Sequence, residues 1–99
     1  MLVEGGIYAQ RGGLFRWSVL KVLKLDRDVV HLRSYRNRFW RRPPAEAVDG
    51  LDWSVGHMPF AMSTVDRWSL HLIATQPVTD DELEGYRIWA SEDGAGVWS

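Results

Sequence analysis

The stretch of sequence that decides the fold runs from residue 14 to residue 39 and reads LFRWSVLKVLKLDRDVVHLRSYRNRF. Two segments rich in apolar and aromatic residues, Leu14 to Leu25 and Val29 to Phe39, lie on either side of the polar triplet Asp26-Arg27-Asp28. β-branched and aromatic residues favour strands, whereas Asp residues favour turns. The stretch therefore predicts a β-hairpin whose turn lies at residues 26–28.

Side-chain alternation assigns the two faces of the second strand. Val30 and Leu32 point to one face, because successive side chains of a strand point to opposite sides. The other face carries His31, Arg33, Tyr35, Asn37 and Phe39. This pattern predicts one buried face and one face half in solvent.

The first strand does not alternate cleanly. Val19-Leu20 and Val22-Leu23 place apolar groups on both faces, with Lys21 between them. A β-bulge or a sharp bend would explain this pattern, because either feature turns a strand from one sheet face to the other. A helix over residues 19–25 is the competing interpretation.

Further short elements are indicated around this hairpin. Gly5 to Arg11 predicts a strand that ends in a turn at Gly12-Gly13, and Pro43-Pro44 ends the strand meander. Residues 45–52 are expected to form a surface loop. Gly56-His57-Met58-Pro59 suggests a second turn. A short helix near 63–69 and a strand over 70–74 follow.

The C-terminal region contains the clearest helix signal. Thr79 is typical of an N-cap, and the acids that follow, Asp80, Asp81 and Glu82, suit the positive end of a helix dipole. A stripe of Leu83, Tyr86 and Trp89 predicts the buried face of a helix near 80–91. Gly94 and Gly96 would end it.

Together these elements predict a mainly β domain of the α+β class. We expect a small strand-rich barrel or a strongly bent antiparallel sheet, with one short helix near 63–69 and one C-terminal helix near 80–91. Since the chain has 99 residues, it forms one domain over residues 1–99.

Three segments resemble a family of small, uncharacterised bacterial proteins. They are KVLKLDRDVVHLRSYRNRF from residue 21, GHMP from residue 56 and PVTDDELEGYRIW from residue 77. The hairpin half is also similar to Tudor-like and Src-homology-like small barrels, in topology and without a specific motif. The resemblance implies the fold and carries no activity or site residue with it.

Composition and charge narrow the class of protein. The sequence has no Cys, which excludes disulfides and thiolate chemistry. We find no signal peptide in MLVEGGIY and no membrane-spanning run, and we therefore expect a cytoplasmic protein with no membrane partner. The net charge of -1 conceals +7 on residues 1–42 and -8 on residues 43–99. Such a split can mean that the two halves neutralise each other within the fold, that the basic half binds an acidic partner, or that two copies of the chain pair head to tail. The sequence leaves the oligomeric state open.

The densest cluster of candidate functional residues follows the hairpin. Arg groups and aromatic rings can together hold a peptide, or can bind phosphates and stack bases. With the loop residue His57, the predicted partner-binding set is Arg33, Tyr35, Arg36, Arg38, Phe39, Trp40, Arg41, Arg42 and His57. In the competing interpretation, the rings cap the barrel and the Arg side chains pair with the acidic half.

No pattern in the sequence indicates catalysis. His31, His57 and His71 match no metal-ligand spacing, and no serine lies in a Gly-x-Ser-x-Gly motif. We therefore expect no cofactor, no metal and no enzymatic activity. The sequence favours a non-catalytic interaction module for a protein or peptide partner. Nucleic-acid binding through the same Arg residues is the alternative, ranked second because the isoelectric point is about 6.3.

Overall fold

The computed structural model describes residues 2–12, 16–92 and 96–98. Its strands form one antiparallel sheet in the order β4-β3-β2-β1-β5. The elements are β1 (Gly6–Gly12), β2 (Arg16–Asp26), β3 (Val29–Tyr35), the 3₁₀ helix η1 (Ala45–Gly50), β4 (Trp53–Ala61), α1 (Met62–Val65), β5 (Leu70–Thr75) and α2 (Glu84–Ser91). The mainly β prediction is confirmed.

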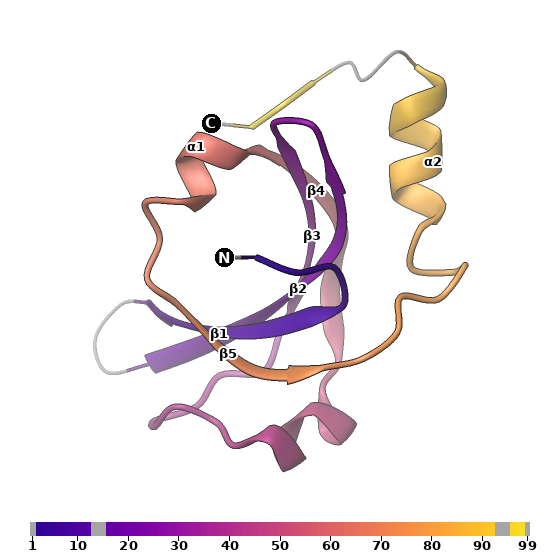
Figure 1. Ribbon diagram of the computed structural model, residues 1–99. Coiled ribbons are helices and arrows are strands. Elements are labelled where there is room, and N and C mark those ends of the chain that lie inside the picture. The colour runs from indigo at the N-terminus through magenta and orange to yellow at the C-terminus, as the bar shows by residue number, and fades with distance from the viewer. Residues whose placement is uncertain (1, 13–15, 93–95, 99) are drawn as a thin grey trace.

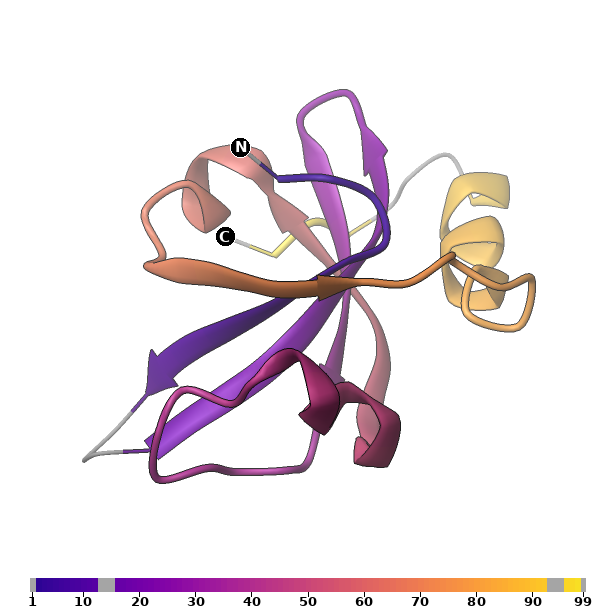
Figure 2. The ribbon, with the colours of Figure 1, turned by 60° about the horizontal axis from the view of Figure 1, so that its bottom comes forward.

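The sheet curls strongly, so that it has a concave inner face and an outer face (Figure 1). α1 lies at the open side of the curl, and α2 stands against the outside, away from η1 (Figures 1 and 2). The inner face holds the main core, in which the sheet packs against Val65 of α1. Its buried members are Tyr8, Leu20, Val22, Val30, Leu32 and Val65.

The predicted bulge in the long strand β2 is confirmed. Val22 pairs with Leu32, and Lys24 pairs with the next residue of β3, His31, which leaves Leu23 as the extra residue. The bulge interrupts the side-chain alternation at Leu23, whereas Val19 and Leu20 lie on opposite faces because each face has its own core. The continuous strand excludes the helix considered for residues 19–25. The turn predicted after β2 is also present, with Arg27 at a φ of 58°. The turn predicted at Gly12-Gly13 falls partly outside the described residues.

The outer face of β3 is not half in solvent, and that prediction was wrong. His31 and Tyr35 are both buried. The reason is that segments distant in the sequence cover this face: η1 covers one end, where Ile7, Val19 and Tyr35 form a second core with Val48 and Leu51. The segment after β5 and helix α2 cover the other end. β3 itself ends at Tyr35, and Phe39 rejoins the sheet only through an isolated bridge to Trp17.

The Gly56-His57-Met58-Pro59 segment is part of strand β4 and forms no turn, which corrects that prediction. Because β4 lies at the edge of the described sheet, Pro59 can occupy it without removing a ladder hydrogen bond. On the side of Pro59 away from β3, the backbone N–H of Trp98 donates to the Pro59 carbonyl over 2.7 Å. Trp98 therefore packs on β4.

The two helices are shorter than predicted. α1 covers Met62–Val65 in place of residues 63–69, and no side chain caps it. Residues 45–52, predicted as loop, contain η1. Residues 80–83 form turns, so that α2 begins at Glu84 rather than near residue 80. Thr79 nevertheless acts as a cap for those turns, as the next subsection describes.

Candidate functional site

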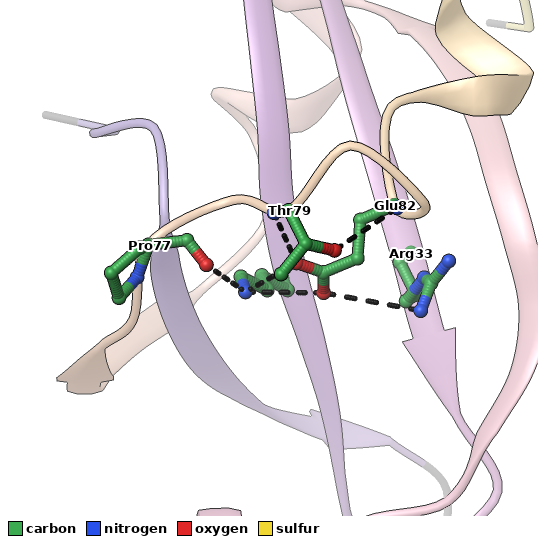
Figure 3. A network of polar contacts seen from close by, with 5 residues as sticks. Arg33, Pro77, Thr79 and Glu82 are labelled. Carbon is green, nitrogen blue, oxygen red and sulfur yellow. Dashed lines mark hydrogen bonds and ion pairs between the residues drawn. The ribbon is translucent and has the colours of Figure 1, made fainter.

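Lys21 lies at the centre of the outer face of the sheet and is only 2% exposed. Its position follows from the alternation of β2, which points Lys21 to the same side as Val19. A buried ammonium group must be compensated by polar partners. Lys21 Nζ donates to the Pro77 carbonyl over 3.0 Å and to both carboxylate oxygens of Glu82 over 3.0 and 3.1 Å. The segment after β5 is thus tied to the middle of the sheet (Figure 3).

Glu82 also closes the turn that leads into α2. The backbone N–H of Thr79 donates to Glu82 Oε1 over 2.9 Å, and the backbone N–H of Glu82 donates to Thr79 Oγ1 over 3.2 Å. This reciprocal pair is a capping box, and it fixes the carboxylate above Lys21. Burial opposes ionisation of Glu82, but the hydrogen bonds from Thr79 and Lys21, with the charges of Lys21 and Arg33, outweigh it and hold the pKa of Glu82 below its ordinary value.

Arg33 lies beside Lys21 on the neighbouring strand β3, since the two residues are register partners. Its guanidinium carbon is 5.1 Å from the centre of the Trp53 ring. Arg33 Nη1 is 3.9 Å from Glu82 Oε2, which is too long for a hydrogen bond. Its Nε is buried without a hydrogen-bond partner among the described residues.

Two histidines form the next layer, under α2. His31 Nδ1 and His57 Nε2 are 2.7 Å apart and share a hydrogen bond, and the two ring planes differ by only 11°. The rings of Tyr86 and Trp89 meet His31 edge to face at 4.6 and 4.5 Å. Burial and the neighbouring His57 lower the pKa of His31 to about 4, although Asp26 opposes the shift; burial also lowers the pKa of His57. Both rings are therefore neutral at pH 7.

α2 is held close to the sheet by a glycine and a tyrosine. A Cβ atom at Gly85 would lie 2.5 Å from the Cβ of His57, so only glycine permits this approach. The Tyr86 hydroxyl donates to Asp26 Oδ2 over 3.0 Å. Of the predicted stripe, Tyr86 and Trp89 face the sheet and contact His31, but they are only half-buried, and Leu83 lies just before the helix, so the predicted fully buried face is wrong.

Between these elements lies an open cleft of about 800 Å³. Its floor is the sheet at Lys21 and Arg33, one wall is β4 at Trp53, Gly56 and His57, and the other walls are the 76–82 segment and the first turns of α2. Trp53 is 54% exposed and is the aromatic residue among those that line the cleft. We call this hollow the outer cleft. It combines an aromatic ring, a half-buried guanidinium and carboxylates in a concave site.

The outer cleft unites two of the predicted partner-binding residues, Arg33 and His57. Tyr35 is buried under η1, and the Phe39 backbone pairs with Trp17. The other Arg residues of the predicted set do not line the outer cleft. Arg38 donates to the carbonyls of Tyr35 and Asn37, and Arg36 Nη2 lies 3.5 Å from the Trp53 carbonyl. Arg42 contacts His71, and Arg41 is exposed. Trp40 is 71% exposed beside Arg16.

Four contributors to the site were not predicted: Lys21, Trp53, Glu82 and the pairing of His31 with His57. From the sequence, Glu82 is expected only at the positive end of the helix dipole. The position of Lys21 between the apolar pairs Val19-Leu20 and Val22-Leu23 was the available signal for a buried ion pair, because a buried charge requires a partner.

Comparison of the chain with family models, curated proteins and solved structures gave no match. The resemblance to small bacterial proteins and to Tudor-like barrels therefore stays a prediction. Within the residues that the structure describes, no group of three or more His, Cys, Asp or Glu side chains could hold a metal ion. No helix in that part of the chain is long and apolar enough to cross a membrane.

Proposed function

We propose that the protein is a non-catalytic interaction module and that a peptide segment of a protein partner binds in the outer cleft. The observation that carries the proposal is the combination in one concave site of a half-exposed Trp53 and an Arg33 side chain that makes no hydrogen bond to any residue the structure describes. Trp and Arg are the side chains most often found as energetic anchors of protein interfaces. A volume of about 800 Å³ is within the usual range for ligand sites.

The polar groups below the cleft support a binding role rather than a catalytic one. The ammonium group of Lys21 makes three hydrogen bonds within the protein, so it is not available as a nucleophile. One ring nitrogen of His57 is bonded to His31. These groups hold the 76–88 segment against the sheet and thereby form the walls of the cleft.

We also infer that the curled sheet is a small barrel of the Tudor-like or Src-homology-like kind. The sheet curls strongly, and its two edge strands, β4 and β5, are connected through α1, which lies at the open side of the curl (Figure 1). This shape supports a partly open barrel.

The alternative is a nucleic-acid-binding domain that uses Arg36, Arg38, Arg41 and Arg42 on phosphates. The exposed Trp40 ring, with Arg16 Cζ 4.6 Å from its centre, favours this second candidate because such a ring can stack on a base. Trp40 and Arg16 do not line the outer cleft. The peptide and nucleic-acid candidates can therefore be told apart by substitutions, because each predicts loss of binding at different residues.

Peptides selected from a random phage-displayed library on the whole protein provide the test. Each selected peptide is synthesised with a fluorophore, and its affinity is measured by anisotropy at ~150 mM salt, where exposed ion pairs are weak. Trp53→Ala should weaken binding about tenfold or more, as the loss of an interface anchor does. Trp40→Ala is the matched control, since both rings are more than half exposed. Peptides that depend on Trp40 and ignore Trp53 would refute the outer cleft as the binding site.

A further inference from the structure

We propose that the outer cleft binds a carboxylate group through Arg33 and a positively charged group beside it, so that the ligand is a peptide segment carrying both charges. The inference rests on the proposed function and specifies the chemistry that the cleft recognises. It follows from three features of the cleft: the unused donors of Arg33, the way its guanidinium is held, and the placement of the acids.

The first feature is the contrast between Arg33 and Lys21. The Lys21 ammonium is saturated by three protein acceptors. The Arg33 side chain is partly buried, with 14% of it exposed, and it makes no hydrogen bond to a described residue. Its Nε is buried, so the donors that a ligand in the cleft can reach are the two Nη groups. The planar fork of a guanidinium matches the two oxygens of a carboxylate. The cleft therefore contains a preformed donor for an acceptor from outside.

The second feature is that the guanidinium is held in place. One side faces the Trp53 ring at 5.1 Å, and Nη1 is 3.9 Å from Glu82 Oε2. Nη2 lies 3.9 Å from the position that a Cβ at Gly56 would take, so the absence of a side chain there leaves the guanidinium accessible from β4. A donor held in this way loses little conformational entropy when a ligand binds.

The third feature is the placement of the acids, which determines the class of ligand. Glu82 is neutralised by Lys21, but Asp81 and Glu84 also line the cleft, are exposed, and form no ion pair with a described residue. These two carboxylates would repel a phosphate dianion more strongly than a carboxylate. They would also attract a cation that lies next to the bound carboxylate. A ligand with both charges matches the cleft better than either an anion or a cation alone.

The test is a ¹H–¹⁵N NMR titration of the whole protein with acetyl-Lys-Glu-amide, and with acetyl-Lys-Gln-amide as the control that lacks the carboxylate. The reporters are the Nε–H of Arg33 and the indole N–H of Trp53. We expect saturable shifts of both signals with the Glu peptide, with a Kd of ~1–10 mM for so small a ligand. The Gln peptide should bind at least tenfold more weakly. Sodium acetate, inorganic phosphate and sodium chloride at equal ionic strength are titrated in parallel, and acetate should shift the reporters more than phosphate does.

Substitutions separate this inference from the proposed function. Arg33→Lys keeps the charge and removes the planar fork, and it should weaken binding of the Glu peptide about tenfold, as read from the Trp53 signal. Arg41→Lys, at an exposed position outside the outer cleft, should not weaken it. Equal shifts with the Glu and Gln peptides, or a larger response to phosphate, would overturn the carboxylate site. If phage-selected peptides still required Trp53 but tolerated Arg33→Lys, the carboxylate inference would fail while the interaction module remained.

Discussion

Gly85 of α2 lies against His57 of β4 so closely that a Cβ atom at position 85 would be 2.5 Å from the Cβ of His57. This contact joins the Gly-His-Met-Pro strand segment to the helix and sets the width of the outer cleft, which both residues line. The helix, the 76–82 segment and the sheet thus form one unit around Lys21, Arg33 and His57.

The first prediction follows from that contact. Gly85→Ala should destabilise the protein by about 1–2 kcal/mol in urea unfolding, because the clash with His57 exceeds the gain in helix propensity of about 1 kcal/mol. Gly50→Ala is the control, since a Cβ there meets nothing within 4 Å. A Gly85→Ala protein as stable as the wild type would show that α2 does not pack on β4 in this way.

The buried ion pair makes a second prediction. Glu82→Gln should cost about 3–5 kcal/mol, because it leaves the ammonium of Lys21 buried without a counter-charge, whereas Gln still permits the cap to Thr79. The double variant Lys21→Met/Glu82→Gln should be more stable than Glu82→Gln alone. For comparison, Asp80→Asn removes the exposed pair with Arg87 and should cost less than about 1 kcal/mol. Additive losses from Lys21→Met and Glu82→Gln would contradict the pairing.

His31 predicts a dependence of stability on pH. Its folded-state pKa of about 4 lies below the ordinary value of 6.5, so the unfolded chain binds more protons between these values. The contribution of neutral His31 is complete above pH 6.5 and is lost as pH falls toward 4, by about 3 kcal/mol in total. His31→Leu should flatten this part of a plot of unfolding free energy against pH, measured by urea unfolding. The same slope in both proteins would show that His31 is not held neutral by the fold.

A fourth prediction concerns nucleic acid. Labelled single-stranded and duplex oligonucleotides should show no sub-micromolar binding at ~150 mM salt, because the acids of the second half repel a polyanion and are only partly screened over about 8 Å. Sub-micromolar binding that disappears in the Arg36→Ala/Arg38→Ala variant would instead favour the nucleic-acid candidate. The slope of the logarithm of affinity against the logarithm of salt concentration would then give the number of phosphates that the protein neutralises.

Local patterns predicted most of the strands but little of the site. The alternation of β3 and the doubled apolar pairs of β2 indicated the hairpin and its bulge, because these features depend on neighbours along the chain. The burial of His31 and Tyr35 could not be predicted in the same way, since the segments that cover them come from far along the sequence. Gly56 to Pro59 resembled a turn because an edge strand tolerates the same residues.

The predicted binding set was too local for the same reason. It grouped Arg and aromatic residues that are adjacent in sequence, and the sheet then separated them: Arg33 faces the outer cleft, Tyr35 is buried under η1, and Trp40 lies beside Arg16. Trp53 is brought to Arg33 by the pairing of β3 with β4, and Glu82 is brought there by its ion pair with Lys21. Both contacts join residues that are far apart in the sequence, so no local sequence pattern indicates them.

The most direct test of the outer cleft as the binding site is a map of backbone amide shifts when a phage-selected peptide is added to ¹⁵N-labelled protein. If the peptide lies in the outer cleft, the amides of Gly56, His57 and Gly85 should shift together and saturate at one Kd. Shifts confined to the amides of Trp17, Phe39 and His71, with the amides of the cleft residues Gly56, His57 and Gly85 unchanged, would contradict binding in the outer cleft.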